Sequence, residues 1–550
     1  MPYFLLNLVQ KKMKRFIEIS SLSVISLINL AAVALILYAT NKGIDFSDES
    51  FHLLFSSSLD QPVNFSAYKY DILFKSLHME FSIMEIRLIR FFSLLMGVAF
   101  LSNTIIKKFS SKKVNPFITI NSILLATIII YVRGAHSLSY NTIILILTIF
   151  LTGLFLKSLA SPKKWLPPVL SSLLLYGVYV TKFPSSILFL GLILGALFLF
   201  ALKDKAYWIT LRNYLICLIV VWGILFVLHP KTKILTTLDV ISNLNYGDDY
   251  SIASMLNSFF LELVYLFAFF CFGILIRFFH STVKFKHTYS FTLCLIFVGL
   301  GYSYFVNWQV HFASIRIPLF LMLLNGFYVQ SFMELELKLK IVILIMFATP
   351  FTLAFGSNNP LNIHLNYFTP FWIIVIATLA LKGDLQSFLA PTLLFTSLLV
   401  SYEIRDNLIR HPYHQESLSQ NTELIQYNGS NHYISKQSKE NLDKLKNLLK
   451  ESPHESEYML AVSRLVGEVL FTGKKFPSTP IWSKDRLDDW LKNNPNLPEK
   501  FYFLSNHSQN LTLKLIDKIK GYNQMKIGEY IRENHVQKKE TILLYFLSKP

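Results

Sequence analysis

Residues 17–38 read IEISSLSVISLINLAAVALILY, an apolar stretch whose only charged residue is Glu18. A helix of this length is about 30 Å long, which matches the hydrocarbon core of a bilayer. A basic segment, residues 11–15, comes directly before it. Because the stretch is longer than the apolar region of a cleaved signal peptide, we expect an uncleaved membrane-spanning helix.

Similar apolar runs recur along the chain. Of its 550 residues, 53% are hydrophobic and 16% are charged, against roughly 45–50% and about 25% in an average soluble protein. An excess gathered into runs of about 16–23 residues is typical of a membrane bundle. We therefore predict an all-α polytopic membrane bundle of about 13 transmembrane helices. Their centres fall near residues 28, 95, 125, 149, 173, 194, 218, 266, 297, 323, 348, 374 and 394.

The basic residues indicate how the chain is oriented. The formal charge is +18, from 52 Lys and Arg against 34 Asp and Glu. These cations cluster between apolar runs, which is typical of topology signals and not of a nucleic-acid surface. With the N-terminus in the cytoplasm, the inside loops hold about twice as many Lys and Arg as the outside loops, as the positive-inside rule requires. An odd number of spans then puts the C-terminal part outside.

The chain divides into two parts by composition. We expect residues 1–402 to form the membrane domain, with a first outside loop at about 40–82. Residues 403–550 are polar and are predicted to form a small extracytoplasmic α/β or α+β domain. Within it, the leucines of residues 439–449 recur at helical spacing. All three cysteines lie in apolar segments, so no disulfide framework is expected.

The first outside loop contains GIDFSDESFH, residues 43–52. Ser47 is placed to begin a short helix whose first turn holds Asp48 and Glu49. Backbone N–H groups at a helix start favour negative charge, so both carboxylates are expected to be ionised. An ionised carboxylate beside the bilayer can act as a general base on an acceptor hydroxyl or amine. The alternative is an acidic helix cap in a surface loop.

The Asp48-Glu49 pair lies in a long outside loop after a first span whose N-terminus is expected in the cytoplasm. This arrangement resembles that of the bacterial GT-C fold glycosyltransferases of the protein O-mannosyltransferase and lipid A aminoarabinose transferase group. A surface-helix candidate at 68–81 and the stretches 86–97, 139–141 and 182–184 carry the resemblance further. It covers about residues 10–400 and implies a GT-C-like fold. It also implies transfer of a sugar from a polyprenyl-phosphate-linked donor to a lipid, glycan or protein acceptor, at the outer face of a bacterial cytoplasmic membrane.

The resemblance implies that Asp48 is the base and that Glu49 orients it. A departing phosphate gains negative charge, so cations or a metal are expected near it. The candidates for binding the donor phosphate are Arg133, His136, Lys182 and Arg316. The candidates for binding substrate are His52, Arg87, Asn141 and His311. The alternative for the cations is an interfacial side chain that reaches to water, and for Arg87 it is a pair with Glu85 or a lipid phosphate.

Other functions and a metal are left open by the residues. Asp48, Glu49 and His52 are possible ligands for a divalent metal, but no zinc-type spacing is present, so we assign none. One base and a phosphate leaving group suffice for a single displacement with inversion. The alternative function is a transporter or flippase of a lipid-linked saccharide, although no related halves with broken helices stand out. A polysaccharide polymerase or ligase is a third alternative, but its largest loop usually comes late in the chain.

Overall fold

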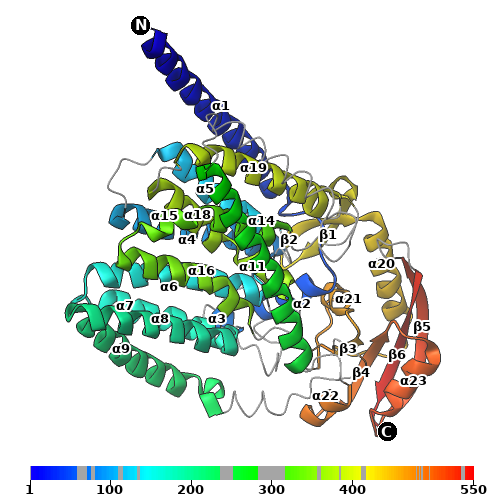
Figure 1. The fold of residues 1–550 in the computed structure, drawn as a ribbon. Helices are drawn as coiled ribbons and strands as arrows, with labels where there is room; N and C mark the ends of the chain where they lie inside the picture. Colours follow the sequence, from blue (N-terminus) through cyan, green and yellow to red (C-terminus); the bar gives the residue numbers. More distant parts are fainter. Residues whose placement is uncertain are drawn as a thin grey trace.

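The computed structural model is a mostly helical bundle followed by a small domain that contains strands (Figure 1). It describes residues 2–57, 71–75, 81–109, 115–132, 137–235, 252–282, 316–355, 361–382, 386–410, 417–477, 480–481, 484, 487–494, 496–533 and 539–550.

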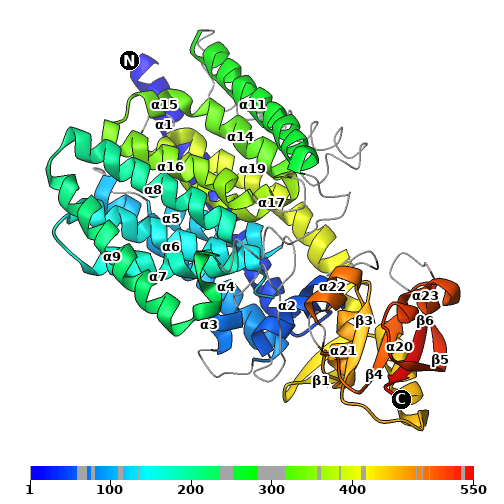
Figure 2. The ribbon, with the colours of Figure 1, turned by 90° about the horizontal axis from the view of Figure 1, so that it is seen from below.

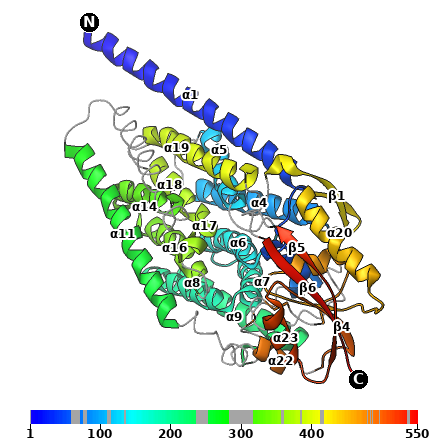
Figure 3. The ribbon, with the colours of Figure 1, turned by 90° about the vertical axis from the view of Figure 1, so that its right-hand side faces the viewer.

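The bundle precedes the strands in the sequence. Its helices are α1 (Pro2–Ala39), α2 (Asp48–Ser57), α3 (Asp71–Lys75), α4 (Ile83–Phe109), α5 (Pro116–Tyr131), α6 (Tyr140–Ala160), α7 (Leu166–Thr181), α8 (Phe183–Lys203), α9 (Ala206–Leu228), η1 (Pro230–Thr232), α11 (Ile252–Thr282), α14 (Arg316–Phe327), α15 (Val329–Met333), α16 (Leu337–Ala354), α17 (Leu361–Phe368), α18 (Pro370–Lys382), α19 (Gln386–Ile404) and η3 (Arg405–Arg410). Helix α1 runs along one side of the bundle and packs on α5 and α19 (Figure 3).

Seven helices in the described part of the chain are long and apolar enough to cross a membrane, judged by length and composition. They are α1, α4, α6, α8, α9, α11 and α16, and shorter apolar segments lie in α5, α7, α14 and α18. Twelve of the predicted span centres fall inside helices, and the one near residue 297 lies outside the described residues. The predicted multi-span helical bundle is therefore confirmed, whereas the count of 13 stays a prediction.

Side-chain chemistry explains how these helices pack in an apolar medium. On α11, Phe260, Leu261, Val264 and Phe267 are exposed at helical spacing, as expected of a face that meets lipid. Between α1 and α5, Asn29 Nδ2 donates to Asn121 Oδ1 at 2.9 Å. Such hydrogen bonds hold helices together where apolar burial gives no preference for protein over lipid.

The C-terminal domain combines strands and helices. Its elements are η5 (Leu418–Gln420), β1 (Asn421–Tyr427), β2 (Ser430–Ser435), α20 (Lys436–Glu451), β3 (Met459–Val462), α21 (Val466–Thr472), α22 (Leu487–Asn493), β4 (Lys500–Ser505), α23 (Gln509–Asp517), β5 (Asn523–Glu533) and β6 (Lys539–Ser548). Strands β1 and β2 form a hairpin through Asn428 and Gly429, whose positive φ angles of 45° and 72° are those of a tight hairpin turn. The other four strands form a sheet of order β3-β4-β6-β5, in which β3 and β4 are parallel.

The mixed composition of this domain confirms the predicted small domain with strands. The helical spacing of its leucines is also confirmed, because Leu442 and Leu445 are buried on the inner face of α20. The domain lies at one end of the bundle, where α21 contacts α2 (Figure 2). Ile44 and Phe51 of the first loop and α2, Ile86 of α4, and Phe471 of α21 belong to one hydrophobic core. The domain and the bundle are therefore packed together through the first loop.

Candidate functional site

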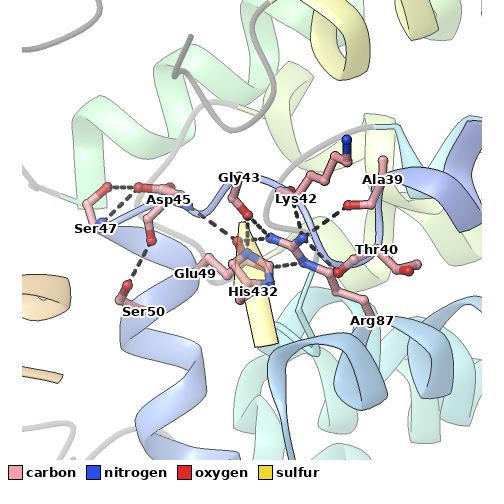
Figure 4. Close-up of polar contacts among 10 residues, drawn as sticks. All are labelled: Ala39, Thr40, Lys42, Gly43, Asp45, Ser47, Glu49, Ser50, Arg87 and His432. Atoms are coloured by element: carbon pink, nitrogen blue, oxygen red, sulfur yellow. Dashed lines mark hydrogen bonds and ion pairs between the residues drawn. The ribbon is translucent and has the colours of Figure 1, made fainter. Parts of the chain in front are cut away.

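A buried ion pair joins α2 to α4 at the membrane-domain end of the first loop. Arg87 Nε donates to Glu49 Oε1 at 2.9 Å, and Nη2 donates to Oε2 at 2.8 Å (Figure 4). Both side chains are 0% exposed. Burying either charge alone would cost several kcal/mol. The bidentate contact between the guanidinium and the carboxylate offsets that cost and allows both side chains to be buried. The pair fixes the first turn of α2 against the bundle.

The same guanidinium also holds the turn that leaves α1. Arg87 Nη1 donates to the carbonyl oxygens of Ala39, Thr40 and Lys42 at 3.0–3.3 Å, and Nη2 donates to Gly43 O at 2.7 Å. Carbonyls at a helix C-terminus have no partner in the helix and attract a cation. One side chain thus binds the end of α1, the following turn and the start of α2. Glu85, the alternative partner considered from sequence, accepts from Ser82 N at 2.8 Å.

Asp45 and Asp48 lie close together but in different surroundings. Asp45 accepts from Ser47 N at 2.7 Å and from Ser47 Oγ at 2.6 Å. Burial, followed by the negative charges of Asp48 and Glu49, raises the pKa of Asp45 to about 7 despite these hydrogen bonds. Asp48 begins α2 as predicted, and its side chain is exposed. The loop therefore holds one carboxyl group with a raised pKa and, three residues on, one carboxyl group that is exposed to solvent.

Two of the predicted substrate-binding residues lie next to this loop. His52, on α2, is buried with its ring centroid 5.8 Å from that of Tyr140 at the start of α6. Burial and the charge of Arg90 lower the pKa of His52 to about 3, so the ring is neutral. Asn141 follows Tyr140 and is buried, and its Oδ1 has no hydrogen-bond partner among the described residues. The structure thus brings His52 near the start of α6, where Asn141 lies.

Lys182, a predicted phosphate ligand, binds a helix end in this structure. Its Nζ is buried and donates to Leu353 O at 2.7 Å, at the C-terminus of α16. Ser185 Oγ donates to the same carbonyl at 3.0 Å. Burial lowers the pKa of Lys182 to about 7. The side chain therefore caps α16, a contact that no local pattern around Lys182 predicts.

Four of the predicted site residues lie wholly or partly outside the residues that the structure describes. Arg133, His136 and His311 lie outside the described residues, and so does the side chain of Arg316, whose backbone begins α14. In the described part of the chain, no three His, Cys, Asp or Glu side chains are grouped as metal ligands.

The C-terminal domain also contacts the loop. Gly43 N donates to Tyr433 O at 2.7 Å, and Tyr433 N donates to Asn41 O at 2.8 Å. Gly467 N donates to Phe46 O at 2.7 Å, and a Cβ at residue 467 would lie 2.7 Å from the Phe46 Cα. Only glycine permits that approach. Sequence analysis missed Asp45, although it lies three residues before Asp48. It also missed these contacts, because about 390 to 420 residues separate the partners and periodicity carries no signal over such a separation.

The chain is similar in structure to ArnT and AglB. It is 12% identical to ArnT from Cupriavidus metallidurans in the apo state, with a TM-score of 0.40 over 95% of this chain and 98% of that one. For the same ArnT bound to undecaprenyl phosphate, the identity is 10%, the TM-score is 0.38 and the coverage is the same. For the archaeal oligosaccharyltransferase AglB from Archaeoglobus fulgidus, in complex with an inhibitory peptide and a dolichol-phosphate, the identity is 11% and the TM-score is 0.41, over 96% and 74% of the chains. No protein-family model matches the sequence, and no curated protein does.

The burial of the Glu49–Arg87 pair predicts a large effect of removing one charge. Glu49→Gln leaves the guanidinium buried without a counter-charge, so we expect a loss of about 3–5 kcal/mol in stability, measured as a lower thermal unfolding midpoint in detergent. Glu529→Gln is the control, because the Lys526–Glu529 pair is exposed and such pairs contribute at most about 1 kcal/mol. Equal midpoints for the two variants would contradict the anchoring role of the pair.

The raised pKa of Asp45 predicts a pH-dependent stability. The group changes from an ordinary pKa of 3.8 to about 7 on folding. The folded protein therefore holds this proton more tightly, and the wild type loses stability as the pH rises from about 4 to about 7. Asp45→Asn cannot ionise and avoids that loss. The difference in thermal unfolding midpoint, variant minus wild type, should rise from about pH 4 to about pH 7 and level off above that range. A difference that does not change with pH would show that Asp45 is not buried.

Proposed function

We propose that this protein is a glycosyltransferase that moves a sugar from a polyprenyl-phosphate-linked donor to an acceptor on the extracytoplasmic face of a bacterial membrane. The acceptor is a lipid, a glycan or a protein, the anomeric carbon is inverted, and Asp48 is the general base. This proposal adopts the function that the sequence resemblance implies.

The observation that carries the proposal is the exposed Asp48 carboxylate beside the buried Glu49–Arg87 pair. Adjacent residues on the first turn of α2 point one into the protein core and one to solvent. Because Glu49 is held at both carboxylate oxygens, the backbone that carries Asp48 has little freedom to rotate. A general base must be held in reach of the proton that it removes, and a rigid helix start meets that need.

The proposed reaction is a single displacement. Asp48 takes the proton of the acceptor hydroxyl as the acceptor oxygen forms its bond to the anomeric carbon. The bond from that carbon to the donor phosphate breaks, and the electron pair leaves with the polyprenyl phosphate. Attack from the face opposite the leaving group inverts the configuration. A positioned base of this kind contributes about 10²–10⁴-fold to the rate.

Asp45 acts on Asp48 through its charge state. Two carboxyl groups this close cannot both ionise at low cost, and burial keeps the proton on Asp45 up to about pH 7. Asp48 is the exposed one of the two residues, so it is the one that an acceptor can reach. We assign Glu49 and Asp45 as residues that position and tune Asp48.

The leaving phosphate needs positive charge or hydrogen-bond donors. We retain Arg133, His136, Lys182 and Arg316 as candidates for this role, and His52, Arg87, Asn141 and His311 as candidates for substrate binding. Arg87 acts indirectly, because its donors are bound to Glu49 and to backbone carbonyls. Lys182 would have to leave Leu353 O to meet a phosphate.

The test is sugar transfer in membranes given a radiolabelled polyprenyl-phosphate sugar and a set of acceptors. We expect the wild type to transfer label and Asp48→Asn to lose at least about a hundredfold, the scale of a general base. Asp45→Asn should keep most of the activity below pH 7, because asparagine resembles the protonated acid. Asp443→Asn is the matched control, a partly exposed acid on α20 that pairs with Lys439.

Two results would contradict the proposal. Equal rates for the wild type and Asp48→Asn would remove Asp48 from the base role, and loss in Asp45→Asn alone would move that role to Asp45. Movement of the lipid-linked sugar between leaflets without its consumption would favour a transporter or flippase.

A further inference from the structure

We infer that His432 of the C-terminal domain is a positioning residue of the active site, which holds the loop that carries Asp48 through a hydrogen bond to Gly43. This inference rests on the proposed function and adds a part of the protein that the proposal does not involve. The C-terminal domain would then be part of the catalytic apparatus, and not only a cover or an addition to the bundle.

The contact is direct and buried. His432 Nε2 lies 2.8 Å from Gly43 O, and the ring is 1% exposed (Figure 4). The same carbonyl accepts from Arg87 Nη2 at 2.7 Å. Gly43 O thus receives one hydrogen bond from the membrane domain and one from β2. Its two lone-pair directions are both used, which fixes the orientation of this peptide group.

The chemistry of the partners sets the state of the histidine. A carbonyl only accepts, so Nε2 must carry the hydrogen and the ring donates through it. Burial, followed by the charge of Arg87, lowers the pKa of His432 to about 3, so the ring is neutral beside the guanidinium. Nδ1 has no hydrogen-bond partner among the described residues. The side chain therefore serves as a neutral donor at one fixed point.

The neighbouring backbone makes the same connection. Lys42 and Tyr433 form a parallel bridge, so the turn after α1 pairs with β2. Four residues after Lys42, Phe46 O accepts from the backbone N–H of Gly467, the residue before Glu468. Arg532 of β5 binds Glu468 of α21 and reaches Glu540 of β6 at 2.7 Å. The loop from residue 41 to residue 46 is therefore held at both ends by elements that are themselves tied into the domain.

Because the loop is bound to the C-terminal domain, the position of the domain helps to determine where Asp48 lies. Asp45 lies within the held segment, and Ser47 follows it directly before α2 begins at Asp48. A displacement of about 1 Å at a catalytic group can cost about a hundredfold in rate. The side-chain hydrogen bond of His432 is to the backbone of the loop, so its loss should lower kcat while the KM for the donor changes little.

The experiment compares three substitutions at residue 432 in the full-length protein, using the same transfer assay. Gln places its side-chain N–H close to the position of His Nε2, whereas the shorter Asn places its own near Nδ1. We expect H432A and H432N to lose about tenfold to a hundredfold in kcat, and H432Q to recover most of it. Asn431→Ala is the control, because Asn431 is exposed on the same strand and should leave kcat unchanged.

The outcomes separate the two claims. Full activity in all three variants, equal activity of H432N and H432Q, or a loss in H432Q as large as in H432A would each overturn the positioning role. If all three variants lose activity equally and their thermal unfolding midpoints fall as well, with no difference between H432Q and H432N, the role of His432 is merely structural. That result would also overturn the positioning role. A wild type that transfers no sugar would instead overturn the proposed function, and the role of His432 in it.

Discussion

The buried contact of Arg87 with Glu49 is the constraint on which the rest of the site depends. A guanidinium and a carboxylate without exposed surface are stable only as a pair, and only with their remaining donors bound. Arg87 meets this condition by taking both oxygens of Glu49 and the carbonyls that end α1. The first span, the second span and the start of α2 are thereby fixed to each other at one point. Everything proposed for Asp48 follows from its place next to that point.

The C-terminal domain extends the same constraint from the other side. Its hairpin strand β2 pairs with the turn after α1, and α21 approaches Phe46 so closely that residue 467 must be glycine. Apolar residues of the loop, of α4 and of the domain fill one core. A surface loop without such packing has few internal contacts to keep it in one conformation. Here the contacts that keep the loop in one conformation come from the bundle and from the C-terminal domain, two parts of the chain that are far apart in sequence.

Local patterns in the sequence predicted the elements but not the contacts between them. The apolar runs predicted the bundle because lipid requires about 20 apolar residues for each helix, and Asp48-Glu49 predicted the start of α2 because helix N-termini favour acids. The sequence could not predict that Glu49 pairs with Arg87, or that Lys182 caps α16, since these contacts depend on how helices pack. His432 was missed for a related reason, as nothing near it in the sequence indicates Gly43. The predicted roles of Asp48 and of the phosphate ligands stay predictions.

The most direct test of this account is a structure of the protein with a polyprenyl-phosphate-linked sugar bound. The account predicts that the anomeric carbon lies beside Asp48, with room for an acceptor hydroxyl at hydrogen-bond distance from its carboxylate, about 2.6–3.2 Å. The Glu49–Arg87 pair would be intact beneath it. A donor bound elsewhere, with the Asp48 carboxylate facing only solvent, would contradict the account.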